Sequence, residues 1–154
     1  MRTSLLLIAS LLAGCSGAGA ASAPADSVAP PVDPTLRAIN DDYLASAKPL
    51  FARACASCHG PGNALPWYHA IPFVRGMIDD DIARARRTMD MSHDFPFRGR
   101  GTPAEYLEAI GEVLDEGSMP PLRYRALHWA AGFDTPEKDI VREWVGRSLL
   151  RLDE

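Results

Sequence analysis

The first half of the chain opens with a helical pattern of apolar positions. Between Ala38 and Cys58 apolar residues recur every three or four positions: Tyr43, Leu44, Ala47, Leu50, Phe51 and Ala54. Pro49 interrupts this pattern, because proline is tolerated in the first turn of a helix but not in its middle. We therefore expect a short helix to about Ala47 and a second helix that begins near Pro49.

Two later stretches carry both a helical pattern and a start signal. Thr102-Pro103-Ala104-Glu105 predicts a helix with a capping box and proline at its first position, ended by Gly117. Thr135-Pro136-Glu137 predicts the start of the last helix in the same way. The expected buried positions are Tyr106, Leu107, Ile110, Val113 and Leu114 in the former and Ile140, Val141, Trp144, Val145 and Leu149 in the latter.

The middle of the chain is harder to assign. Gly62–Gly76 has no period and is expected to be a loop, in which Ile71, Phe73 and Val74 join the core. Asp79-Asp80-Asp81 suits the start of a helix, because carboxylates are favoured at the positive end of the helix dipole. Residues 91–101 read as a further loop. The helical patterns predict an all-α class, with about four to five short helices.

Composition limits the possible functions. The chain has 154 residues, enough for one domain with a real core, and a formal net charge of −4. A nucleic-acid-binding domain would usually show a strong basic excess, so nucleic acid is not an expected partner.

The most informative sequence motif is Cys55-Ala56-Ser57-Cys58-His59, which places two thiols and an imidazole within five residues. Cys-x-x-Cys-His is the spacing at which haem is attached in c-type cytochromes. Residues three apart share one face of a helix, so both thiols can meet one porphyrin edge while His59 ligates the iron. We expect one covalent haem c, with the helix stopped by Gly60 and Pro61. A zinc site would need a second pair of ligands, which the chain lacks.

The N-terminus predicts export and anchoring. Residues 1–14 read as a signal peptide, with Arg2 before a short apolar run that cannot span a bilayer. The run ends in Leu12-Ala13-Gly14-Cys15, which resembles a bacterial lipobox and implies lipidation of Cys15. Ser16 follows, rather than an aspartate, which favours the outer membrane. An ordinary cleaved signal with a chance cysteine is the alternative.

Residues 15–34 are then a flexible tether of small residues, and residues 35–154 form the haem domain. The predicted location is the cell envelope, facing the periplasm. The membrane would be met through Cys15, and the partners of the domain would be redox proteins.

A methionine offers a sixth iron ligand. Met119 lies between a predicted helix end and Pro120-Pro121, which stiffen the backbone, and thioether sulfur is a soft ligand suited to haem iron. The alternatives for this position are His128, His69, His93 and Met91. Trp67 and Tyr68 are expected to border the ring. Arg98, Arg100, Arg123 and Arg125 are candidate partners of the propionates.

These features together resemble the bacterial haem-binding-domain proteins, a cytochrome c-like group. The resemblance runs from Cys55 to about Trp144 and includes Pro66-Trp67-Tyr68, the strap Gly117-x-Met119-Pro120-Pro121-x-x-Tyr124, and His128. It implies a mostly helical fold with one covalent haem c, and it adds Tyr124 to the cofactor-binding candidates. Gly60-Pro61 and residues 91–100 depart from the family pattern.

The functional hypothesis is an electron carrier without enzyme activity, with His59 and Met119 as iron ligands. The alternative is a haem enzyme or sensor, peroxidase-like or gas-binding, with an open or exchangeable sixth site. For that role the chain offers His93, His128 or Arg98 as distal groups, but none lies in a motif that demands it.

Overall fold

The computed structural model describes residues 33–62 and 65–154. The predicted signal peptide, Cys15 and most of the tether lie outside the described residues. The chain begins with α1 (Pro34–Asp42), a π-helical turn η1 (Tyr43–Ala47) and α2 (Lys48–Ala54), which follow one another without a break. This confirms the change of helix near Pro49. The wider π turn precedes the proline, whose ring would clash with the preceding turn of a regular α-helix.

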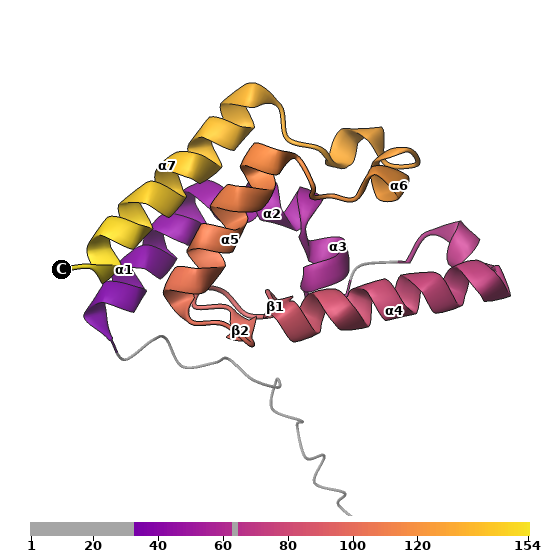
Figure 1. Cartoon of the computed structure of the whole chain (residues 1–154), viewed down its shortest axis with the longest axis horizontal. Helices are drawn as coiled ribbons and strands as arrows, with labels where there is room; N and C mark the ends of the chain where they lie inside the picture. The colour runs from indigo at the N-terminus through magenta and orange to yellow at the C-terminus, as the bar shows by residue number, and fades with distance from the viewer. Residues whose placement is uncertain (1–32, 63–64) are drawn as a thin grey trace, which may run out of the picture.

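The rest of the described chain is also mainly helical (Figure 1). In order, it contains α3 (Ala56–His59), η2 (Trp67–Ala70), α4 (Pro72–Thr88), α5 (Pro103–Glu116), α6 (Leu122–Arg125), η3 (Trp129–Ala131) and α7 (Thr135–Leu152). Two short strands, β1 (Met89–Asp90) and β2 (Arg98–Gly99), pair antiparallel with Met89 opposite Gly99. The all-α class is therefore confirmed. The helices are less uniform than expected, since α4 has 17 residues and α7 has 18.

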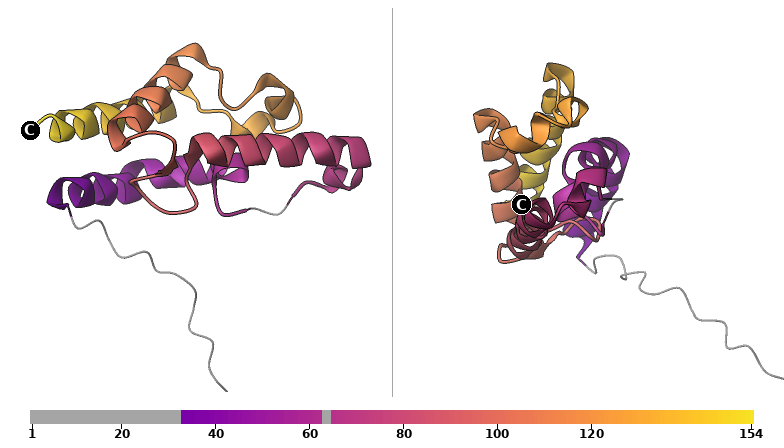
Figure 2. Two further views of the ribbon diagram at one scale, coloured as in Figure 1. Left: turned by 60° about the horizontal axis from the view of Figure 1, so that its bottom comes forward. Right: turned by 90° about the vertical axis from the view of Figure 1, so that its right-hand side faces the viewer.

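The core lies where α1, η1 and α2 meet α5 and α7 (Figure 2). Trp144 of α7 is fully buried, and its ring centroid lies 5.4 Å from that of Tyr43 and 5.7 Å from that of Phe51. The Trp144 indole nitrogen donates to the Ile39 carbonyl. The first and last helices pack together through Ala47, Phe51 and Trp144, because all three side chains are buried in this cluster.

The predicted α5 is confirmed in detail. Thr102 and Glu105 form a capping box, Pro103 opens the helix, and Gly117 follows it in the left-handed conformation with φ of 63°. The last helix has the same design, but Asp134 rather than Thr135 caps it. Ile140 of α7 was predicted to be buried and is exposed.

The middle of the chain contradicts several predictions. Helix α4 begins at Pro72 rather than at the aspartates, so Asp79–Asp81 lie inside it and half of the expected loop is helical. Phe73 is 84% exposed and Ile71 is also exposed, so neither joins the core. The β1–β2 hairpin interrupts the second expected loop, and Phe95 and Phe97 between its strands are buried. In the described part of the chain, no helix is long and apolar enough to span a membrane.

Candidate functional site

The Cys-x-x-Cys-His motif occupies a sharp helical corner. Cys55 ends α2, and its carbonyl accepts hydrogen bonds from the backbone nitrogens of Cys58 at 3.1 Å and His59 at 2.9 Å. Both cysteines are free thiols on a single turn, as the spacing predicted. The expected stop at Gly60 is also observed. A side chain there would come within 2.7 Å of the Ala56 carbonyl oxygen, so glycine is required at this turn.

The His59 ring is oriented by a backbone carbonyl. Its Nδ1 lies 2.7 Å from the carbonyl oxygen of Met89 in β1, so Nδ1 carries the proton and donates it. The backbone is fixed as well, because the Met91 nitrogen donates to the His59 carbonyl at 2.8 Å. This arrangement leaves Nε2 with its lone pair for a metal. A hydrogen bond of this kind is the usual way in which proteins orient a ligating histidine.

The Cys55 side chain turns towards the protein interior. It packs against the core cluster, and burial, with a smaller contribution from nearby Cys58, raises the pKa of its thiol to about 12. Because the thiolate is the reactive form, a neutral thiol of this kind is protected from oxidation.

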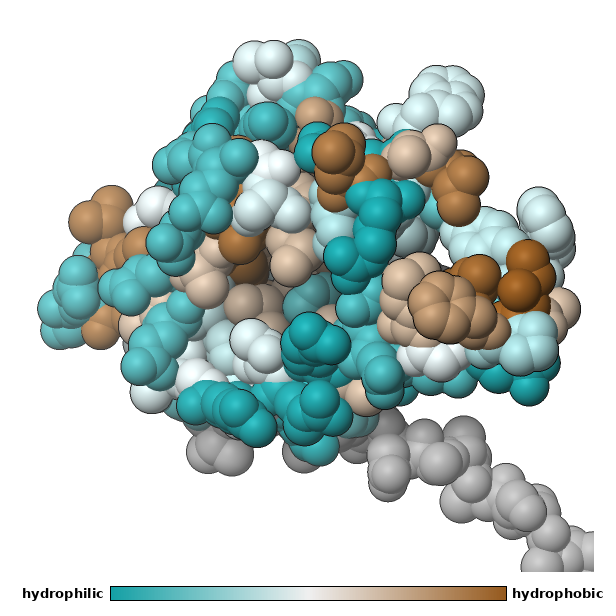
Figure 3. All heavy atoms as spheres, turned by 45° about the vertical axis from the view of Figure 1, so that its right-hand side comes forward, coloured by the Kyte–Doolittle hydropathy of each residue, from teal (hydrophilic) through white to brown (hydrophobic). Residues whose placement is uncertain are grey.

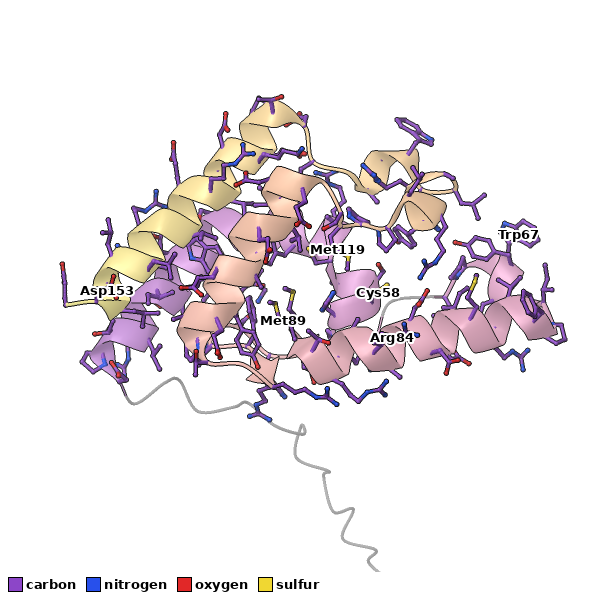
Figure 4. The ribbon with its side chains drawn as sticks, viewed as in Figure 1. Cys58, Trp67, Arg84, Met89, Met119 and Asp153 are labelled. Carbon is purple, nitrogen blue, oxygen red and sulfur yellow. The ribbon has the colours of Figure 1, made fainter. Side chains whose placement is uncertain are left out.

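Met119 lies on a stiff segment between α5 and α6. We call residues 118–121 the strap: it leaves α5 at Gly117, contains the buried Pro120, and leads into α6. The Met119 side chain is 49% exposed rather than packed as core. In the view of Figure 4, Met119 on the strap and Cys58 on α3 border the same region beside α5, with Met89 below them.

Tyr68 of η2, Tyr124 of α6 and His128 form one cluster of ring contacts. The Tyr68 hydroxyl lies 2.5 Å from His128 Nε2, and the Tyr124 ring stacks on the His128 ring with centroids 4.2 Å apart. Burial raises the pKa of the Tyr68 hydroxyl, with smaller contributions from Tyr124 and Cys58. Tyr68 and Tyr124 both contact the His128 ring. Trp67 packs on the edge of Tyr68 but is 82% exposed.

The other suggested iron ligands have contacts of their own. His128 is bonded to Tyr68, His69 is paired with Asp79 at 2.8 Å, and Met91 packs against the core. Within residues 33–62 and 65–154, no group of three or more His, Cys, Asp or Glu side chains could hold a metal ion.

The residues present fit a haem group. The described residues include two thiols that could attach the porphyrin covalently, together with an imidazole with a free Nε2 and an exposed thioether that could ligate its iron. The buried Nε atoms of Arg86 and Arg125 have no hydrogen-bond partner among the described residues, and each could serve a carboxylate such as a propionate. Arg123, another candidate for that role, is instead paired with Asp81.

Sequence reasoning missed two features of this site. It did not foresee the Met89 carbonyl as the partner of His59, and it treated His128 as a candidate iron ligand rather than as the partner of Tyr68. A backbone carbonyl leaves no signal in residue type. The recurrence of Tyr68, Tyr124 and His128 in the family pattern was the available hint for the second.

Comparison with known proteins agrees with this chemistry. The haem-binding domain family matches residues 22–147. The chain is also 29% identical over 100 residues to the cytochrome c peroxidase Ccp of Escherichia coli (strain K12); the match covers 64% of this chain and 22% of that protein. No solved structure matches. The chain belongs to the haem-binding domain family and is a haem protein.

Proposed function

We propose that this chain is a c-type cytochrome that transfers single electrons, with one haem attached through Cys55 and Cys58. The observation that carries the proposal is the hydrogen bond from His59 Nδ1 to the Met89 carbonyl, which leaves Nε2 as the iron ligand beside the two thiols. The bound haem supplies a ferric/ferrous couple. Met119 on its strap is proposed as the sixth ligand, and such a His/Met pair raises the reduction potential.

The protein's own contribution is to hold both ligands in place in either redox state. His59 is fixed at its ring nitrogen and at its backbone, and Pro120 and Pro121 stiffen the backbone beside Met119. Trp67, Tyr68 and Tyr124 are proposed to border the ring. A saturated iron with fixed ligands suits electron transfer, because it leaves no coordination site for a substrate.

A second candidate is peroxide turnover. It is favoured by the similarity to a protein named as a peroxidase, although this chain spans only about a fifth of that protein's length. Such activity would require Met119 to leave the iron. A ferric protein that binds cyanide slowly and turns over no peroxide would support the electron carrier. Rapid binding with steady turnover would support the enzyme.

We also propose the organisation and location of the protein from its sequence. Residues 1–14 would be removed as a signal peptide, Cys15 would carry lipid, and the haem domain would be held by the tether at the outer membrane, facing the periplasm. Redox proteins of the envelope would be its partners. Export supports the haem proposal, because haem c is attached outside the cytoplasm.

Matched cysteine variants separate attachment from anchoring. The full chain would be produced with a cytochrome c maturation system, and haem content measured by the pyridine haemochrome spectrum. Cys55→Ser with Cys58→Ser should abolish covalent haem, whereas Cys15→Ser should keep the haem and release the protein from the membrane fraction. Covalent haem that survives loss of both motif cysteines would refute the attachment proposal.

A further inference from the structure

The strap continues into a segment that is attached to α2 at one place and to α4 and η2 at others. We call residues 118–132 the strap arm; it comprises the strap, α6 and η3. Its C-terminal end is held by Arg53 of α2, whose guanidinium donates to the carbonyls of Ala130 and Gly132. Towards α4 and η2, it is held by Arg123–Asp81 and by Tyr68–His128.

The middle of the strap arm is a single hydrogen-bonded unit. The backbone nitrogens of Tyr124 and Arg125 donate to the Pro121 carbonyl, and that of His128 donates to the carbonyls of Tyr124 and Arg125. The stacked rings of Tyr124 and His128 reinforce the unit. A contact that holds His128 in place therefore also restrains the backbone back to Pro121, two residues after Met119.

The two attachments to η2 and α4 differ in strength. The Arg123–Asp81 pair is open to solvent, and exposed ion pairs contribute little. The Tyr68–His128 bond is partly buried, lies between two aromatic rings, and joins the strap arm to the segment directly following the haem motif. Partial burial strengthens such a bond, because water competes less for it.

We propose that Tyr68 and His128 are positioning residues that keep the Met119 sulfur on the iron. This inference rests on the proposed function, in which Met119 is the sixth ligand. Neither residue binds the metal: the Tyr68 hydroxyl holds His128, and this bond ties the strap arm to η2. Breaking the bond should let the strap lift more often and expose the iron to outside ligands.

The test is the rate at which cyanide binds to the ferric holoprotein, since cyanide must wait for Met119 to leave. Tyr68→Phe removes only the hydroxyl and should speed binding about fivefold, the factor expected from one partly buried hydrogen bond. His128→Phe keeps a ring for Tyr124 to stack on and should give a similar increase. The double variant should bind no faster than either single variant, because both remove the same bond.

Tyr106→Phe is the matched control. Its hydroxyl accepts a hydrogen bond from the Gly101 nitrogen at 2.9 Å, near the start of α5 and away from the strap. This variant should lower the unfolding midpoint as much as Tyr68→Phe does but leave the cyanide rate unchanged. Tyr68→Phe and Tyr106→Phe binding cyanide at the same rate would overturn the proposal, as would rate increases that multiply in the double variant.

The far-red absorption band of the wild-type ferric protein distinguishes a failure of the Met119 ligand assignment from a failure of the positioning role of Tyr68 and His128. A weak far-red band marks a methionine–iron bond. If the wild-type protein lacks it, the ligand assignment in the proposed function fails. If the band is present and Tyr68→Phe has no effect on cyanide binding, only the positioning role fails.

Discussion

Two tryptophans show how differently the two ends of this molecule are built. Trp144 on α7 is 0% exposed and surrounded by the rings of Tyr43, Phe51 and Phe95. Trp129 on η3 is 88% exposed. At the first end, apolar side chains from several helices fill one core. At the second, large apolar side chains on η2, α4 and the strap arm face outward.

At that second end, the exposed apolar side chains come from two segments, residues 65–73 and the strap arm. They are Leu65, Trp67, Ile71, Phe73, Leu122, Leu127 and Trp129. Figure 3 shows apolar surface near the outer end of α4 and over α6. The comparison therefore separates an end whose apolar residues fill the core from an end whose large apolar residues are exposed.

The largest expected effect tests this division directly. Trp144→Ala should lower the free energy of unfolding of the haem-loaded protein by about 3–5 kcal/mol, because it empties the centre of the core. Trp129→Ala should change it by no more than about 0.5 kcal/mol. Guanidinium unfolding followed by circular dichroism measures both. A similar loss for both variants would contradict the division.

Arg53 links the two ends, and its removal should have an intermediate effect. Arg53→Gln loses the bonds to the carbonyls of Ala130 and Gly132 and the pairing with Glu137, and should cost about 1–2 kcal/mol in the same experiment. Arg142→Gln, which breaks only exposed pairs with Asp115 and Asp139, is the control and should change little. Equal losses would show that Arg53 is merely a surface residue.

Asp42 should make the stability of the fold decrease in acid. The Arg147 and Arg151 guanidiniums lower the pKa of Asp42 below its ordinary value of 3.8, mainly through the Arg147 hydrogen bonds. The folded carboxylate therefore adds stability above pH 3.8, and this contribution is lost as the pH falls through the lower folded value. Asp42→Asn should show a smaller loss of stability than wild type between pH 6 and pH 3. Parallel pH profiles for the two proteins would refute the role of Asp42.

The smallest effect concerns Ser148 in α7. Its side chain is fully buried, and its hydroxyl has no hydrogen-bond partner among the described residues. Ser148→Ala removes this unpaired group and should leave stability unchanged or raise it by up to about 1 kcal/mol. A clear loss of stability on thermal unfolding would mean that the hydroxyl is satisfied in solution.

Local signals in the sequence predicted the core end well. The capping box at Thr102, the glycine that ends α5 and the apolar stripe around Trp144 all act within a few residues, so their effect can be worked out from the chain itself. The start of α4 was missed, although Pro72 at its first turn was a usable signal. The aspartates in that helix were given more weight than the proline.

Other parts of the fold and the site depended on contacts that sequence spacing does not encode. Phe95 and Phe97 enter the core from a loop without periodicity, because the hairpin turns them inward. The bond between His59 and the Met89 carbonyl joins residues 30 positions apart, and that between Tyr68 and His128 joins residues 60 apart. The motif identified the haem chemistry, but the supports of both proposed ligands required the fold.

The most direct test of the account is the far-red spectrum of the ferric holoprotein, recorded for wild type and Met119→Ala. The account predicts a weak far-red band in the wild-type protein and its complete loss in Met119→Ala, with covalent haem retained in both. A band that survives in Met119→Ala, or a wild-type protein that lacks it, would contradict the assignment of His59 and Met119 as the two ligands of an electron-transfer haem.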